Sequence, residues 1–218
     1  MVVVVALLTA IAAHAQWRVG ATTGGDYNFY SMNKQYMTDL EVQGGLGFTA
    51  GVSGQYNFKD WLGVRVDLNV TQKNYQIHRA MLENYEYRYR NNYMQLPMMA
   101  AFSFGGKKLR GVCNLGFYTG YWLNSHREGT DYDSYSDKYV DFNEEVEFNN
   151  DRDNRLDCGL VGSAGLEYHM NPNWTIQFEA RYYYGLSSAT KQYMRVKDYR
   201  YNSTLAFQVS VYYVFKKK

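Results

Sequence analysis

Apolar and polar residues alternate along much of the chain, and the alternation is clearest in residues 174–186. One face of this segment is apolar or aromatic, and the other carries charge. The first face holds Ile176, Phe178, Ala180, Tyr182 and Tyr184, and the second holds Thr175, Gln177, Glu179, Arg181 and Tyr183. Because the side chains of a strand point alternately to its two faces, this pattern predicts a β-strand. Turn residues at 170–173 join it to a second predicted strand, 156–169, in a hairpin.

The same alternation predicts six further strands. They cover residues 17–27, 45–58, 62–75, 88–104, 109–123 and 199–215. With the hairpin they make about eight strands, each on the order of ten residues or more, which suits tilted strands that cross a bilayer. The predicted fold is therefore all-β: an eight-stranded antiparallel up-and-down transmembrane β-barrel.

The connections between these strands are alternately long and short. The long connections fall near residues 28–44, 76–87, 124–154 and 187–198. Outer-membrane barrels have short periplasmic turns and longer extracellular loops. We therefore expect the long connections to face outside and both termini to lie on the periplasmic side. A soluble β-sandwich has no reason to sort its loops by length.

The composition fits this barrel. The chain has 23 Tyr and only 2 Pro, and the mean hydropathy of −0.51 does not argue against a barrel, because alternation dilutes the signal of each strand. The net charge of +2 provides no electrostatic footprint for nucleic acid. Aromatic residues near the short turns and the C-terminus are expected to form a girdle at the periplasmic interface. They are Tyr56, Phe58, Trp61, Phe102, Phe104, Tyr168, Trp174, Tyr213 and Phe215.

The first fifteen residues predict a signal peptide. They hold an apolar run of about twelve residues, which is too short to span a membrane. The sequence Ala-His-Ala at 13–15 supplies the small residues of a cleavage site before Gln16, although a basic start is missing. The expected organisation is a signal peptide at 1–15 and an outer-membrane β-barrel domain at 16–218.

The two cysteines do not form a disulfide framework. Cys113 and Cys158 lie on neighbouring predicted strands, at different depths. With about 3.3 Å per residue their separation is roughly 20 Å, whereas a disulfide needs Cα atoms within about 7 Å. We expect both thiols to be free.

A set of short motifs follows in order along nearly all of the mature chain. The set comprises Gly51-Val52, Thr71-Gln72-Lys73, Tyr93-Met94-Gln95-Leu96-Pro97, Gly116 to Gly120, Gly159 to Gly165, and Ala180-Arg181-Tyr182 with Gly185-Leu186. In this order the motifs resemble the PorT-like outer-membrane β-barrel family of the Gram-negative cell envelope, often labelled porin family protein. Members often carry an acidic residue where Gln95 stands, and the three lysines after Phe215 also depart from the pattern.

The resemblance implies fold and location more than activity. The last strand, which ends at Phe215, is similar to the terminal signal that such barrels show to the barrel assembly machinery. Some relatives assist protein secretion across the envelope, and most have no assigned role. The partners implied are outer-membrane lipid and the assembly machinery, with a protein of the envelope as a further candidate, and no nucleic acid.

Candidate metal ligands are few. Asp131, Asp133 and Asp137 could offer oxygen ligands to calcium. Tyr135 and Ser136 stand where a calcium loop needs Asp or Asn and then Gly. A solvated acidic loop is the better interpretation, and the scattered histidines show no zinc spacing.

Catalytic patterns are equally weak. Some small barrels hydrolyse lipids with a nucleophile and a base on the same strand face. Here Ser125 and His126 are adjacent, so on a strand they would point in opposite directions. We expect no catalytic residue, no cofactor and no metal, and hence no enzyme.

The strongest candidate site is a set of charged residues on the inward faces of the predicted strands. It consists of Arg65, Asp67, Lys73, Asp157, Glu167, Glu179 and Arg181. These residues could form a path for protons or ions, or they could pair with one another because an unpaired buried charge is costly. We favour pairing, and we expect a lumen plugged by this network rather than a diffusion pore.

The functional expectation is an integral outer-membrane barrel with a structural or partner-binding role through its extracellular loops, including an accessory role in protein secretion. One alternative is a narrow channel or porin-like transport protein. Another is a soluble periplasmic barrel that binds a small ligand, which would not depend on detergent.

Overall fold

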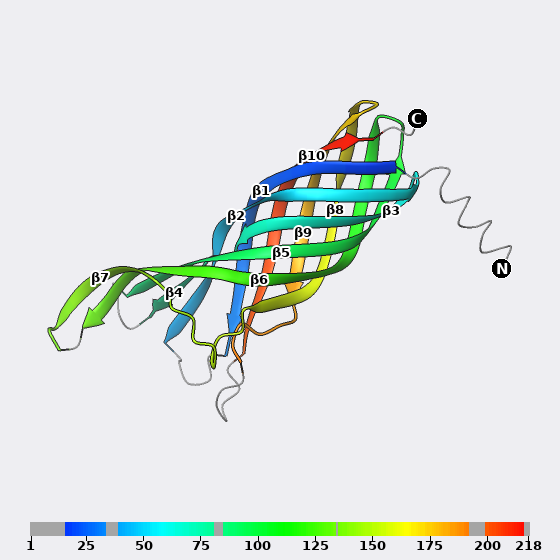
Figure 1. Cartoon of the computed structure of the whole chain (residues 1–218). Helices are drawn as coiled ribbons and strands as arrows, with labels where there is room; N and C mark the ends of the chain where they lie inside the picture. The colour runs from blue at the N-terminus through cyan, green and yellow to red at the C-terminus, as the bar shows by residue number, and fades with distance from the viewer. Residues whose placement is uncertain (1–15, 34–38, 81–84, 134, 192–198, 216–218) are drawn as a thin grey trace.

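A computed structural model of the chain describes residues 16–33, 39–80, 85–133, 135–191 and 199–215. These residues form ten antiparallel strands in one sheet that closes on itself, and they contain no helix (Figure 1). The strands are β1 Gln16–Met32, β2 Leu40–Lys59, β3 Leu62–Gln72, β4 Tyr75–Arg79, β5 Glu86–Gly105, β6 Leu109–Asp133, β7 Lys138–Glu145, β8 Leu156–Asn171, β9 Trp174–Gly185 and β10 Arg200–Val214.

Eight of the ten strands make the wall of the barrel. Their order is β1, β2, β3, β5, β6, β8, β9 and β10, and β10 pairs with β1 to close the ring. The two short strands lie at the end far from the termini, where β4 sits between β2 and β5 and β7 pairs with the end of β6 (Figure 1). The prediction of an eight-stranded antiparallel barrel is confirmed.

The two faces of each strand differ sharply in exposure. On β3, Val66 and Leu68 are 39% and 45% exposed, whereas Arg65 and Asp67 are fully buried. Apolar side chains therefore cover the outside of the barrel, and polar side chains fill the inside. This is the reverse of a soluble β-protein, and it is the arrangement that a bilayer requires.

The third strand breaks where the sequence predicts a continuous strand to residue 75. At Asn74 the side chain, instead of the backbone, bonds to the two neighbouring strands. Its Nδ2 donates to the carbonyl of Leu46 at 2.8 Å, and its Oδ1 accepts from the backbone N–H of Asn91 at 3.3 Å. Gly45 leaves room for this crossing, since a Cβ there would lie 2.7 Å from the carbonyl carbon of Asn74. An asparagine that bonds to nearby backbone competes with the ladder and ends the strand.

Much of the segment expected to be a long acidic loop, 124–154, is a β-hairpin. Strand β6 continues to Asp133, and β7 pairs back onto it. Cross-strand pairs hold the two together: Arg127 Nε donates to Glu144 at 2.6 Å, and Thr130 Oγ1 donates to Asp141 at 2.7 Å. Such pairs stabilise a sheet that has water on both sides.

The predicted aromatic girdle lies on the outer surface, and none of its nine residues is buried. Neighbouring rings touch across strands, as for Trp174 and Tyr213 at 5.3 Å and Tyr213 and Phe215 at 5.1 Å between centroids. The start of β1 and the end of β10 lie at this same end of the barrel (Figure 1). Amphipathic rings at this position suit a membrane–water interface.

The two cysteines are free, as the register predicts. Cys158 pairs across the sheet with Thr119, while Cys113 pairs with Ala164. The offset from residue 113 to 119 corresponds to about 20 Å along the strand. The predicted signal peptide, residues 1–15, lies outside the described residues and stays a prediction. Within the described ranges, no helix is long and apolar enough to cross a membrane.

Candidate functional site

The central feature of the lumen is a quartet of two arginines and two carboxylates. Arg65 and Asp67 lie on β3, and Glu179 and Arg181 lie on β9, which is directly opposite in the ring of eight. Arg65 Nε is 2.8 Å from Asp67, and Arg181 Nη1 is 2.7 Å from the other oxygen of Asp67. Glu179 contacts both arginines, with Arg65 Nη2 at 3.1 Å. The four charges sum to zero.

Polar neighbours complete the coordination of the carboxylates. Glu179 Oε2 accepts hydrogen bonds from Ser163 at 3.0 Å, Gln177 at 3.0 Å and Asn114 at 3.2 Å. Ser53 Oγ donates to Asp67 at 2.5 Å. These four residues come from four different strands, β2, β6, β8 and β9, so the quartet ties together most of the barrel wall.

A second ion pair lies nearer the end far from the termini. Lys73 Nζ is 2.5 Å from Asp157, and it sits 5.1 Å from the ring centroids of both Tyr93 and Tyr118. The Tyr118 hydroxyl donates to the second oxygen of Asp157 at 3.3 Å, as does Ser187 Oγ at 3.1 Å. Two aromatic faces and a carboxylate thus surround the ammonium group.

A third cluster lies near the end that holds the termini. Arg18 Nη1 is 2.5 Å from Glu167 Oε2, and His169 Nε2 is 3.1 Å from Glu167 Oε1. The other ring nitrogen of His169, Nδ1, forms a hydrogen bond with Thr175 Oγ1 at 2.9 Å. Sequence reasoning named Glu167 without its partners. The alternation around Arg18, between Trp17 and Val19, could have placed it inward.

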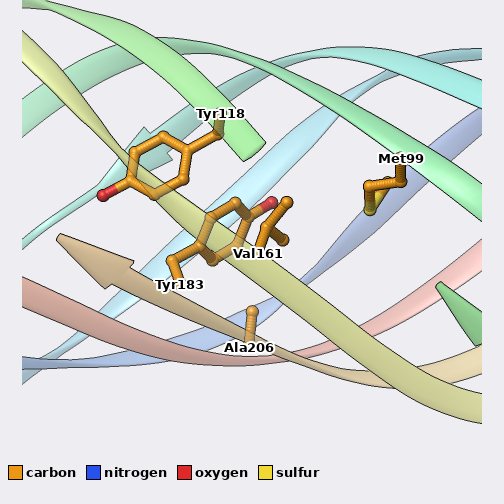
Figure 2. Packing of buried hydrophobic residues seen from close by; sticks show 5 residues of the cluster. All are labelled: Met99, Tyr118, Val161, Tyr183 and Ala206. Carbon is orange, nitrogen blue, oxygen red and sulfur yellow. The ribbon is translucent and has the colours of Figure 1, made fainter. Parts of the chain in front are cut away.

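The seven predicted lumen residues are all buried, and they form three separate clusters. The ring pair Tyr118–Tyr183 lies between two of the clusters, with centroids 5.2 Å apart and planes at 88° (Figure 2), because the Tyr118 hydroxyl bonds to Asp157 and the Tyr183 hydroxyl bonds to Arg181. Glycines make room for the long side chains: a Cβ at Gly165 would lie 2.7 Å from the Cα of Glu179.

One buried carboxylate was missed. Asp26 on β1 is 3% exposed, and neither of its oxygens has a hydrogen-bond partner among the described residues. The same holds for the amide groups of Asn69, Gln95 and Gln208. Residues 22–25 (Thr-Thr-Gly-Gly) show no alternation of apolar and polar side chains, so this part of the predicted strand did not reveal which face Asp26 is on.

The candidate catalytic and metal-binding residues are placed as follows. Ser125 is 2% exposed, whereas His126 points to the other face of β6 and contacts Asn143 Oδ1 at 2.5 Å. Tyr132 donates a hydrogen bond to Asp137. Among the residues that the structure describes, no group of three or more His, Cys, Asp or Glu is placed to hold a metal ion.

Comparison with known proteins agrees with this geometry. Residues 12–191 match the family described as outer membrane protein beta-barrel domain. The structure of OprG from Pseudomonas aeruginosa is similar, with a TM-score of 0.52 and 11% identity over 93% of this chain and 96% of that chain. The Neisserial surface protein NspA has a TM-score of 0.49 and 12% identity, over 91% and 97% of the two chains. The E. coli outer membrane protein W has a TM-score of 0.45 and 15% identity, over 93% of this chain and 98% of that chain.

No curated protein is similar enough in sequence to add to this assignment. The family match covers well over half of the chain, and the closed barrel with an apolar exterior has the form that such a family requires. The chain belongs to the outer membrane protein beta-barrel domain family and is a protein of the outer membrane.

Proposed function

We propose that this protein is a closed, non-enzymatic barrel that acts through its extracellular face, in a structural or partner-binding role. The observation that carries the proposal is that all seven predicted lumen charges are paired inside the barrel. Charges that neutralise one another across a narrow lumen hold its walls together and leave few free groups for a passing solute. The resemblance to PorT-like barrels adds an accessory role in protein secretion.

The extracellular end supports a role in binding a partner. The hairpin of β6 and β7 projects well beyond the barrel wall (Figure 1). It carries exposed apolar and aromatic side chains, with Tyr135 fully exposed and Tyr139 and Val140 exposed by 42% and 50%. Aromatic residues are enriched in protein interfaces relative to the rest of the surface. The proposed partner is a protein of the cell envelope.

The alternative function, a narrow channel, makes an opposite prediction for conductance. We expect the folded, purified protein to give no stable porin-sized conductance steps in a planar bilayer, because the quartet bridges β3 and β9 across the lumen. A large porin measured in the same bilayers is the positive control. Stable steps from the folded monomer would make the channel the first function.

Crosslinking in cells tests the proposed partner. A photo-crosslinking amino acid at Tyr139 on the hairpin should give a discrete protein adduct. The same amino acid at Leu160, which is 54% exposed on the outer wall of β8, should contact lipid and give no such adduct. Equal protein adducts at both positions, or none at Tyr139, would contradict a partner-binding hairpin.

A further inference from the structure

Strand β7 has one edge that no other strand covers. It stands last in the order of the sheet and pairs with β6 alone among the described residues. The hairpin of β6 and β7 projects beyond the barrel wall, which leaves space beside this edge (Figure 1). We call it the free edge. An uncovered strand edge presents unpaired backbone N–H and C=O groups, with which an extended segment of another chain can pair.

The register of the hairpin shows which backbone groups point to the free edge. The N–H of Val146 donates to the carbonyl of Ser125 at 2.9 Å, so it points toward β6. Successive residues of a strand direct these groups to opposite sides, and the even-numbered residues of β7 therefore also bond to β6. The odd-numbered residues direct their N–H and C=O groups to the free edge, and they have no backbone partner on that side among the described residues. They are Tyr139, Asp141, Asn143 and Glu145.

The free edge is acidic on one of its two faces. Asp141 and Glu145 lie on that face, four residues apart. Asp141 accepts a hydrogen bond from the neutral hydroxyl of Thr130 at 2.7 Å, which leaves its charge uncompensated. The hairpin as a whole, residues 126–145, has seven acidic residues and two basic ones. The charge of this edge therefore favours a partner segment with basic side chains.

The same charges disfavour a second copy of this chain as the occupant. In an antiparallel pair of two β7 strands centred on Asn143, Asp141 of one copy would lie opposite Glu145 of the other. Like charges directly opposite each other destabilise a strand pair. Charged side chains at an edge commonly prevent such pairing between identical chains.

The other face of the free edge is apolar near its centre. Val140 is 50% exposed, and Phe142 packs on Tyr87 with ring centroids 4.6 Å apart. Val140 and Phe142 both line a hollow of about 470 Å³. Directly opposite residues of an antiparallel pair share a face. Apolar side chains of an added strand opposite Val140 and Phe142 would therefore lie on this side and lose contact with water there.

We propose that an extended segment of the partner adds to the free edge as an antiparallel strand. Its basic residues lie opposite Asp141 and Glu145, and its apolar residues lie opposite Val140 and Phe142. Along the partner chain the order is basic, any, any, apolar, basic, apolar. Backbone hydrogen bonds provide the attachment, and alternate side chains provide the specificity. This inference rests on the proposed partner-binding role and names the chemistry that the partner must present.

The first test is binding of a labelled, end-capped peptide, Thr-Lys-Thr-Thr-Val-Lys-Val-Thr, to the folded protein in detergent. Fluorescence anisotropy should show saturable binding that weakens as salt is added. The same peptide with glutamate in place of both lysines should bind at least about tenfold more weakly, because like charges then lie opposite each other. No saturable binding of the basic peptide, or equal binding of the acidic one, would overturn the proposal.

Methylation of single backbone nitrogens of the peptide tests the hydrogen-bond ladder itself. A methyl group on the threonine opposite Asn143 replaces an N–H that points to β7, and binding should fall about tenfold or more. A methyl group on the valine opposite Phe142 replaces an N–H that points away from β7, and binding should change less than about twofold. Equal losses for the two methylated peptides would show that no ladder forms at the free edge.

A matched pair of variants tests the charge of the free edge. Glu145→Gln should weaken binding of the basic peptide about threefold, the effect of one exposed ion pair. Glu128→Gln is the control, because Glu128 lies on β6 and pairs with Arg90, away from the free edge. Heat-modifiable migration verifies that each variant is folded. The same loss in both variants would indicate unspecific attraction and contradict the proposed register.

Crosslinking in cells separates failure of this inference from failure of the proposed function. Asn143→Pro removes an N–H from the free edge and keeps the bonds to β6, whereas Asn143→Ala keeps that N–H. Both variants lose the contact of Asn143 with His126. The protein adduct formed from position 139 should persist in Asn143→Ala and disappear in Asn143→Pro. An adduct that survives in both would refute strand addition and leave the partner-binding hairpin standing, while no adduct without either substitution would refute the partner-binding role itself.

Discussion

Replacing Arg181 with alanine should lower the free energy of unfolding by about 3–5 kcal/mol. Arg181 is fully buried and contacts both Asp67 and Glu179. Without it, Arg65 alone faces two carboxylates in a medium where water cannot replace the missing charge. Urea unfolding of the barrel in detergent, followed by tryptophan fluorescence, measures the change.

Two variants control for this effect. Arg90→Ala removes an exposed partner of Glu128, whose ion pair lies outside the lumen, and should cost only about 0–1 kcal/mol. The double variant Arg181→Ala/Glu179→Ala removes one charge of each sign and should be more stable than Arg181→Ala alone. If Arg181→Ala costs no more than Arg90→Ala, the quartet does not stabilise the barrel.

Two neighbouring glycines should respond in opposite ways to the same substitution. Gly24 faces the lumen, where an added Cβ would meet the carbonyl oxygen of Phe207 and the Cα of Gln208, the latter at 2.9 Å. Both are backbone atoms of β10 that cannot move without breaking the ladder with β1. Gly24→Ala should therefore cost about 1–3 kcal/mol, as overpacking does elsewhere.

Gly25 is the matched control on the next residue of the same strand. It points outward, and the nearest atom to an added Cβ is the carbonyl oxygen of Gly47 at 4.0 Å. Gly25→Ala should leave stability unchanged or raise it slightly, because alanine loses less backbone entropy than glycine. The measurement is the urea concentration at the unfolding midpoint of each variant. Equal midpoints would show that the backbone around Gly24 has room for a Cβ, which contradicts the close packing described.

The facing of the strands could be read from the sequence because apolar residues alternate strictly with polar ones. This placed Arg65, Asp67, Glu179 and Arg181 inside the barrel. The partners across the lumen could not be read, because they depend on strand tilt and stagger, which no local pattern encodes. The pairing of Lys73 with Asp157 is an example.

The hairpin of β6 and β7 escaped prediction for a different reason. Beyond the membrane both faces of a strand meet water, so Arg127 and Glu144 or Thr130 and Asp141 show no alternation of polarity. The sequence signal for a strand is the difference between its two faces, and that difference vanishes where the bilayer ends. The break at Asn74 was hidden likewise, since it arises from one side chain bonding to backbone 28 residues away.

The quartet also constrains the order in which the chain can assemble. Arg65 and Glu179, like Asp67 and Arg181, are 114 positions apart in the sequence. Their ion pairs can form only after β9 has arrived opposite β3, when nearly the whole wall is in place. Until then Arg65 can pair only with Asp67 along β3, and Arg181 only with Glu179 along β9. Closure of the sheet and dehydration of its charges are thus one late, cooperative step, and a variant that weakens the quartet should slow the completion of assembly rather than its beginning.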